Sequence, residues 1–377
     1  MTEAKNIQAT SKEEETTVKP NLRAIFVAIL TVAFLALFSP GLASAEDLDI
    51  SRKESYDQIQ AWAKEPVDTA KFKKDPPYRV GLAAGYLSNS WILFAAQYVR
   101  YEVSLHPEVK ELLVTDAGFN PAKQAADIED LLSKNIDLLL FWPVDEKAIM
   151  PALQKAADKG VVTVNIGYNF MHHPAVTANA YVNQWEQSTE AARRLAESLG
   201  GKGRIFAMLP IAGSSAAVVQ LAALKDVLKQ YPNIELASVE YGDWNRAKAK
   251  QLTENLLQRF DRIDGVFSPA GQMSMGVFEA FDVAGRLDEL TMSPGDEYNG
   301  WAKLVKRTGA WGGVTSGLEV AREAVKHGLA ILKGEPVSNA VIVQTRYMTP
   351  EETAKLYQAG RPDDWWPAEL PEAWLPK

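Results

Sequence analysis

From residue 78 onward, short apolar runs rich in Val, Ile, Leu and Phe alternate with longer segments in which apolar residues recur at the period of a helix. Apolar strands joined by helices are typical of parallel sheets covered on both faces. These runs are too many for one sheet, so we predict an α/β fold of two doubly wound parallel-sheet lobes. The expected strands are 79–85, 111–115, 136–141, 161–166, 176–181, 204–209, 234–240, 265–267, 290–292, 310–314 and 340–344.

Capping residues mark two of the expected helix starts. Asn120 and Thr349 are each followed by a proline, which suits the first position of a helix. Thr349 is also followed three residues later by Glu352, so the two form a predicted capping box. Helices are therefore expected directly after residues 120 and 349.

A leader segment precedes this pattern. Residues 24–38 are apolar except for Thr31, Arg23 comes before them, and a Ser-Pro-Gly break follows. Ala-Ser-Ala at 43–45 then matches the small-x-small pattern of a signal-peptidase site. The apolar run is shorter than the roughly 20 residues that span a bilayer. Residues 1–45 therefore predict a cleaved signal peptide, with no stable membrane insertion afterwards.

The alternative is an uncleaved membrane anchor. The segment before the apolar run carries four basic and four acidic residues, so it lacks the net positive charge of a typical leader. No cysteine occurs anywhere in the chain, which excludes attachment through a lipidated N-terminal Cys.

Two flanking segments differ from the repeated pattern. Residues 46–77 are charged and polar, and we interpret them as an extension with a helix near 56–64 and a linker. Residues 361–377 form a tail rich in Pro and Trp, with indole rings at Trp365, Trp366 and Trp374. We expect these rings to hold the tail against the surface.

Composition excludes several classes of function. The formal net charge is −8 and no run of Lys and Arg occurs, which disfavours nucleic-acid binding. The absence of cysteine excludes disulfides, thiolate metal sites and thiol nucleophiles. There is no Gly-x-Gly-x-x-Gly after a strand, no Gly-x-x-x-x-Gly-Lys-Ser/Thr and no Gly-x-Ser-x-Gly. The four histidines lack ligand spacing. We therefore expect neither an enzyme nor a bound cofactor or metal.

Aromatic rings beside amides or carboxylates follow several expected strands. Trp91 comes shortly after Asn89, Trp142 shortly before Asp145, and Trp244 stands in the loop Gly-Asp-Trp-Asn-Arg. Ligands of open α/β sheets bind beyond the carboxyl ends of the strands. Indole faces cover the C–H side of a sugar and amides pair with its hydroxyls, which favours a polyhydroxylated ligand. The alternative is that each ring is an ordinary core residue.

Two other features of these loops allow more than one interpretation. Gly-Ser-Ser at 213–215 precedes a helical segment and could hold a phosphate, contact a hydroxyl or simply cap the helix. Asp116 and Asp145 at strand ends resemble an acid/base pair, although Asp145 is better explained as a helix cap.

Residues 78–344 resemble the ribose-binding-protein group, the periplasmic sugar-binding proteins of ABC importers. The stretches that carry the resemblance, in order, are DAGFNPAKQAADIEDL at 116–131, VTVN at 162–165, PIAGSSAA at 210–217, GVFSPAGQMSMG at 265–276 and LKGEPV at 332–337.

The resemblance implies a type I periplasmic binding protein with a hinge of three chain crossings, near 179–183, 314–316 and 344–346. The lobes would be 78–180 plus 316–344, and 181–315 plus 345–360. Hinge closure would trap a sugar between them, and a periplasmic monomer would deliver it to a membrane permease. A sensory protein that presents sugar to a chemoreceptor or two-component kinase is the alternative.

The resemblance also implies ligand positions. Asn89, Trp91, Asn165, Trp244 and Thr315 fall on family positions, Asp296 lies beside one, and Trp142 replaces an Asn. Several other family positions have lost their charge: an Arg has become Ile166, another has become Val218, and an Asn-Asp pair has become Ala270-Gly271. Charge-assisted hydrogen bonds are the strong ones. We therefore expect a deoxy sugar, a larger or less polar monosaccharide or a polyol rather than ribose.

Overall fold

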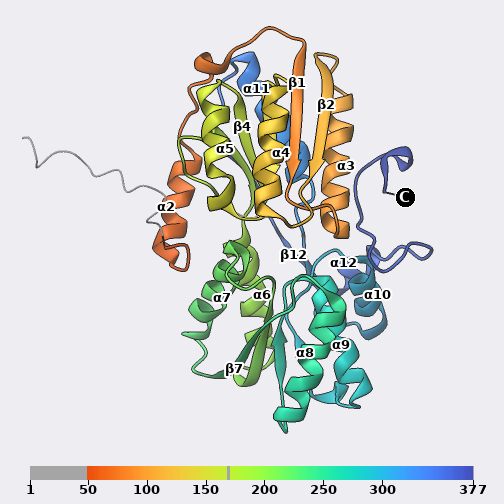
Figure 1. The fold of residues 1–377 in the computed structure, drawn as a ribbon. Helices are drawn as coiled ribbons and strands as arrows, with labels where there is room; N and C mark the ends of the chain where they lie inside the picture. Colours follow the sequence, from red (N-terminus) through yellow and green to blue (C-terminus); the bar gives the residue numbers. More distant parts are fainter. Residues whose placement is uncertain (1–48, 168–169, 377) are drawn as a thin grey trace, which may run out of the picture. The chain divides into compact units, whose positions relative to one another are not determined.

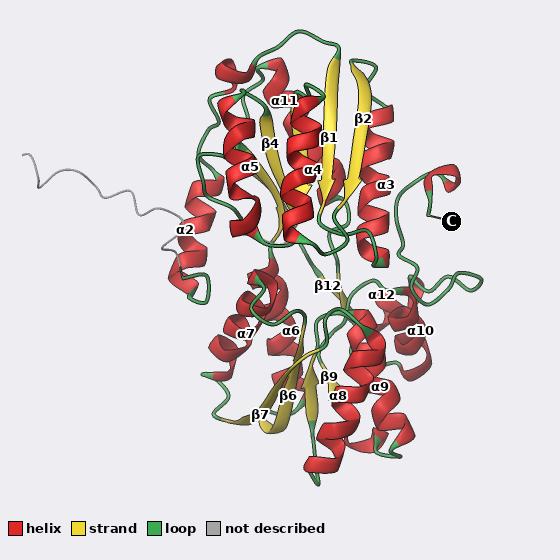
Figure 2. Ribbon diagram, in the orientation of Figure 1, coloured by secondary structure: helices red, strands yellow, loops and turns green. Residues whose placement is uncertain are grey.

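The computed structural model describes residues 49–167 and 170–376, and the expected leader at 1–45 lies outside them. In the part described, no helix combines the length and the apolar character needed to cross a bilayer. The elements of this part form two parallel sheets with helices on their faces (Figures 1 and 2).

The first sheet has six parallel strands in the order β11-β5-β4-β3-β1-β2. Five come from the first part of the chain, and β11 returns from near its end to pair with β5. The strands are β1 (Tyr78–Ala84), β2 (Val109–Asp116), β3 (Leu138–Trp142), β4 (Val162–Gly167), β5 (Ala178–Val182) and β11 (Ala340–Val343).

Helices cover both faces of this sheet because its central strands are apolar on both sides. Leu138 and Leu140 of β3 belong to the core that contains helices α3 and α11. Leu139 and Phe141, which point the other way, pack with helices α4 and α5. The helices are α3 (Ser90–Ser104), α4 (Pro121–Ser133), α5 (Glu146–Asp158) and α11 (Val320–Lys333).

The second sheet has four parallel strands in the order β7-β6-β8-β9. Ile205 and Ala207 of β6 pack with α6 and α7, whereas Phe206 and Met208 pack with α8 and α9. The elements are α6 (Gln184–Ser198), β6 (Lys202–Leu209), α7 (Ser215–Leu228), β7 (Asn233–Tyr241), α8 (Arg246–Arg259), β8 (Gly265–Phe267), α9 (Gly271–Val283), η3 (Leu287–Glu289), β9 (Thr291–Met292) and α10 (Asn299–Thr308). The predicted α/β fold of two doubly wound parallel sheets is confirmed.

Three chain segments connect the two sheets. One joins β5 to α6, one follows β10 (Gly313–Val314), and one joins β11 to β12 (Tyr347–Met348). β10 and β12 pair antiparallel. Beyond them, Thr315 N donates to the carbonyl of Arg346 at 3.0 Å, and Arg346 N donates to Thr315 Oγ1 at 2.9 Å. Two of the three segments are therefore joined by one backbone hydrogen bond and one bond from a backbone N–H to the Thr315 hydroxyl.

The expected strand at 310–314 is wrong in length and in pairing. Only Gly313 and Val314 are extended, and they pair antiparallel with β12 rather than adding a full parallel strand. Trp311 and Gly312 have φ angles of +71° and +68°, and such left-handed residues interrupt a strand. The other ten expected strands are present, with small differences at their ends.

The flanking segments are ordered against the sheets. In the extension, α2 (Lys53–Ala63) is followed by the short helix η2 (Thr69–Phe72). Trp62 of α2 stacks on His172 at a centroid distance of 3.8 Å. After β12 come α12 (Pro350–Lys355), whose capping box between Thr349 and Glu352 is present, and η4 (Glu372–Trp374).

Candidate ligand-binding site

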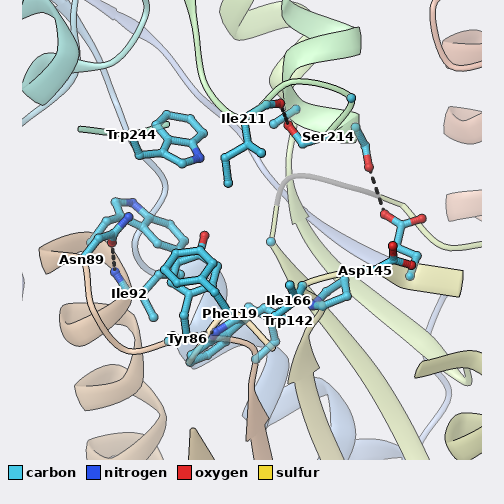
Figure 3. A pocket seen from close by; sticks show the side chains of 18 of the residues that line it. Tyr86, Asn89, Ile92, Phe119, Trp142, Asp145, Ile166, Ile211, Ser214 and Trp244 are labelled. Carbon is cyan, nitrogen blue, oxygen red and sulfur yellow. Dashed lines mark hydrogen bonds between the residues drawn. The ribbon is translucent and has the colours of Figure 1, made fainter. Parts of the chain in front are cut away.

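A cavity of about 640 Å³ is lined by loops that follow strands of both sheets. This volume lies within the roughly 300–1,000 Å³ of small-molecule sites. In Figure 3, Trp244 and Ile211 lie on one side of the hollow, and Tyr86, Phe119 and Trp142 lie on the other. The position agrees with the expectation that ligands bind beyond the carboxyl ends of parallel strands.

Aromatic rings form much of the cavity wall. Tyr86 and Phe119, from the loops after β1 and β2, stack at a centroid distance of 3.9 Å and an interplanar angle of 10°. Trp142, at the end of β3, donates its indole N–H to the carbonyl of Tyr86 at 3.2 Å. The aromatic residues that line the cavity are Tyr86, Trp91, Phe119, Trp142, Trp244 and Trp366.

Asn89 is fixed in the wall because it caps a helix. Its side-chain oxygen accepts a hydrogen bond from Ile92 N at 2.9 Å, which makes it the N-cap of α3. The cap uses the carboxamide oxygen, so the amide nitrogen is the group that can donate to a ligand. Trp91, in the first turn of the same helix, also lines the cavity and is 8% exposed.

Trp244 has an unusual backbone conformation. Asp243 and Trp244 have φ angles of +52° and +55°, which place two consecutive non-glycine residues in the left-handed region. Such a conformation costs free energy and persists only where neighbouring contacts hold it. Gly242 N donates to the carbonyl of Leu209, and Asn245 then caps α8. The turn leaves the indole of Trp244 half-buried in the cavity wall.

Asp296 places a buried carboxyl group at the cavity. Burial raises the pKa of Asp296 to about 7, although the backbone N–H groups of Gly271 and Tyr298 bond to it and work in the opposite direction. The close approach requires glycine at 271, because an added Cβ would overlap Asp296 Oδ1. This carboxyl group can therefore change its charge near neutral pH.

The neighbouring Glu297 does not line the cavity. Burial raises its pKa, while Ser316 N and Ser316 Oγ donate to its Oε2 at 2.8 and 2.7 Å. Ser316 follows directly after Thr315 in one of the connecting segments. The pair Asp296–Glu297 therefore joins the cavity to the chain segments between the two sheets.

Five of the seven residues predicted from the sequence line the cavity, namely Asn89, Trp91, Trp142, Trp244 and Asp296. Asn165 and Thr315 do not. Asn165 is buried and its side chain donates to Asn179 Oδ1 at 3.1 Å, while the adjacent Ile166 faces the cavity. The Thr315 hydroxyl is engaged with Arg346 N.

The loop at 213–215 forms a helix cap. Ser214 Oγ accepts from Ala217 N at 3.3 Å, and Ser215 Oγ donates to Glu146 Oε1 at 3.0 Å, so a carboxylate stands beside this helix start. That carboxylate argues against a phosphate here. Asp145 likewise caps α5, and within the described residues no group of three or more His, Asp or Glu side chains could hold a metal ion.

The sequence interpretation missed Tyr86, Phe119 and Trp366. Tyr86 and Phe119 stand beside predicted strand ends, so an inspection of every aromatic residue in those loops would have found them. Trp366 lies in the tail, outside the segment that carried the resemblance, and gave no such signal.

Comparisons with known proteins agree with this fold. The family model described as "Periplasmic binding protein domain" matches residues 80–336. The ribose import binding protein of Bacillus subtilis is 27% identical over 229 residues, which covers 60% of this chain and 71% of that protein.

Two solved structures show the same fold. An ABC transporter solute binding protein from Bacillus halodurans with bound myo-inositol has a TM-score of 0.68 at 20% identity, covering 75% of this chain and 99% of that chain. The fructose binding periplasmic domain of a hybrid two component system has a TM-score of 0.67 at 21% identity, covering 74% of this chain and 93% of that one.

Proposed function

Because this chain belongs to the periplasmic binding protein domain family, we propose that it captures a monosaccharide, deoxy sugar or polyol outside the cytoplasm and delivers it to the membrane permease of an ABC importer. The observation that supports this most directly is the cavity, which combines six aromatic side chains with a few convergent polar groups. Such a lining fits a small ligand that has both C–H faces and hydroxyl groups.

The polar groups indicate which sugars fit. The amide of Asn89, the amide of Gln272 and the carboxyl group of Asp296 can exchange hydrogen bonds with hydroxyls. Among the described residues that line the cavity there is no arginine, so the bidentate charge-assisted contacts that arginine supplies are missing. We therefore propose a deoxy sugar, a larger or less polar monosaccharide or a polyol rather than ribose.

Capture requires closure of the two sheet-containing lobes on the ligand. We propose that 78–180 with 316–344 and 181–315 with 345–360 move as bodies about the three connecting segments. The hydrogen bond from Ser215 Oγ to Glu146 Oε1 joins α7 to α5 beside the cavity, so a direct contact between these lobes is available to the closed form. A ligand that touches both walls would favour that form through its differential contacts.

A thermal-shift screen of the full chain tests the proposal. The panel contains D-ribose, D-allose, L-fucose, xylitol and myo-inositol. We expect one chemical class to raise the melting temperature, because a ligand at about 100 times its Kd stabilises the native state by about 2.7 kcal/mol. D-Ribose is expected to give a smaller shift than that class. No shift across the panel would contradict a sugar or polyol ligand, and a largest shift with D-ribose would contradict the inference that the ligand is not ribose.

We further propose that residues 1–45 direct the chain to the periplasm and are then removed. Mass spectrometry of the protein from a periplasmic extract should give a chain that starts at Glu46. Recovery of the full-length mass in the membrane fraction would indicate an anchor instead.

A measurement of solute uptake, rather than of binding, distinguishes the sensory alternative from an importer. One of the solved structures with this fold is a periplasmic domain of a two component system, so the fold serves both roles. Deletion of the gene should abolish uptake of the radiolabelled panel hit if the protein serves an importer. Normal uptake together with a lost transcriptional response would support a sensor.

A further inference from the structure

The C-terminal tail contacts both sheet-containing parts of the described chain. It leaves α12 beside α10 and then continues alongside α3, where Figure 1 shows it in dark blue. The family model ends at residue 336, so the tail is an addition to the matched region. It nevertheless contributes a residue, Trp366, to the cavity wall.

Hydrogen bonds from Asn299 and Gly300 to backbone carbonyls fix the tail to the start of α10. Asn299 Nδ2 lies within 3.0–3.2 Å of three carbonyls, that of Gln358 just before the tail and those of Arg361 and Pro362 in the tail. Asn299 N donates to the carbonyl of Trp365 at 2.9 Å, and Gly300 N donates to the carbonyl of Asp363 at 2.8 Å. The path of the tail up to Trp366 is therefore determined by α10.

Side-chain contacts join the same residues to α3. The indole N–H of Trp366 donates to Ser90 Oγ at 2.9 Å, and Glu369 N donates to the hydroxyl of Tyr98 at 2.7 Å. Trp365 meets the ring of Phe94 edge-on at a centroid distance of 5.0 Å. Ser90 stands between Asn89 and Trp91, so Trp366 is held against the turn that carries two cavity residues.

We propose that Trp366 is a specificity-determining wall of the ligand cavity, supplied by the tail, and that it limits the cavity to monosaccharide-sized solutes with an apolar face. This inference rests on the proposed function and extends it to the size and shape of the ligand.

Two observations explain how an indole at this place selects ligands. Trp366 is only 2% exposed, and its N–H bond to Ser90 together with the edge contact to Tyr298 at 5.8 Å fixes the ring orientation. A fixed ring cannot move aside for a bulkier solute, whereas its surface adds apolar contact for a solute that fits. Removal of the ring should therefore weaken the binding of small solutes and allow larger solutes to bind.

The binding test uses isothermal titration calorimetry on the full chain with D-allose, L-fucose, xylitol, myo-inositol and the disaccharide sucrose. Trp366→Ala should lower the affinity for the best monosaccharide or polyol at least 30-fold. The affinity for sucrose should rise relative to the affinity for that solute. Ser90→Ala, which keeps the ring and removes only the hydrogen bond, should give a change of 3- to 10-fold in the same direction. Affinities within threefold of wild type and an unchanged order of solutes in both variants would overturn the proposal.

The matched control is Trp374→Ala. Trp374 belongs to the same tail and contacts the ring of Tyr101 edge-on at 5.5 Å, but it does not line the cavity. Its removal should leave every affinity within threefold of wild type. An equal loss in Trp374→Ala and Trp366→Ala would mean that the tail acts only through stability, and would overturn the specificity role.

A second measurement needs no ligand. Because the chain has no cysteine, Gln272→Cys introduces a single thiol at the cavity wall. Its maleimide labelling should be at least 10-fold faster when combined with Trp366→Ala, and unchanged with Trp374→Ala. Equal labelling rates would show that Trp366 does not close the cavity. If labelling changes as expected but no panel solute binds wild type, the sugar function fails while Trp366 stands as a cavity wall.

Discussion

Replacing Trp244 by alanine should weaken binding of the panel hit about 100-fold while the free energy of unfolding changes by less than about 1 kcal/mol. A central aromatic contact that is lost from a binding site costs about 2–4 kcal/mol, and about 2.7 kcal/mol corresponds to 100-fold. Trp244 is only half-buried. Its φ of +55° also carries a conformational cost, but alanine at this position has a similar cost, so this part of the free energy of unfolding changes little.

Calorimetry gives the affinity and urea denaturation gives the free energy of unfolding for the same preparation. Trp311→Ala is a suitable control, because Trp311 is also half-buried and left-handed, with φ of +71°. Trp311 stacks on Trp301 at 5.9 Å and is absent from the cavity lining. It should therefore lose stability and keep its affinity. A Trp244→Ala protein that binds as tightly as wild type would remove Trp244 from the site.

The fold was predictable because most of its strands can be recognised in the sequence as apolar runs. β3 and β4 are buried on both faces, so they appear as unbroken apolar runs, and even the three-residue β8 follows this rule. The prediction of a strand at 310–314 was wrong because the apolar residues of this segment do not indicate the left-handed turn at Trp311 and Gly312. Backbone conformation at a non-glycine residue is set by tertiary contacts, and sequence patterns carry little of that information.

The cavity was predictable only as far as single loops determine it. Asn89 and Trp142 stand at strand ends, and the rule about carboxyl edges located both. Asn165 illustrates the limit of that rule, because successive strand residues face opposite sides and its side chain turns to Asn179 while Ile166 faces the cavity. Trp366 reaches the cavity through contacts with α10 and α3, which no local pattern encodes.

The free energy of unfolding of wild type should fall as the pH rises from 5 to 8, and Asp296→Asn should abolish this fall. Burial raises the folded-state pKa of Asp296 from 3.8 to about 7. Between these values the native state binds more protons than the unfolded state, so the stabilisation is complete below about pH 4 and is lost as the pH rises through 7. Because one pH unit corresponds to about 1.36 kcal/mol, wild type should lose about 2–3 kcal/mol of unfolding free energy between pH 5 and 8.

Urea denaturation without ligand at pH 5, 6, 7 and 8 measures this difference, and Asp264→Asn is the matched control. Burial opposes ionisation of Asp264, but hydrogen bonds from Arg204 N and Arg262 hold its pKa below the ordinary value. Its stabilising effect is therefore lost only at lower pH, and Asp264→Asn should differ from wild type by a constant amount between pH 5 and 8. Parallel curves for wild type and Asp296→Asn would contradict the raised pKa of Asp296.

The same carboxyl group connects stability with capture of the ligand. Above pH 7 the buried Asp296 is ionised, and its hydrogen-bond donors are the backbone N–H groups of Gly271, Tyr298 and Asp296 itself. A solute hydroxyl that donates to this carboxylate adds a hydrogen bond to the ionised form and lowers the pKa of Asp296. A saturating concentration of the panel hit should therefore flatten the wild-type stability curve between pH 5 and 8 towards that of Asp296→Asn. A solute that binds without changing the slope would have to leave Asp296 uncontacted.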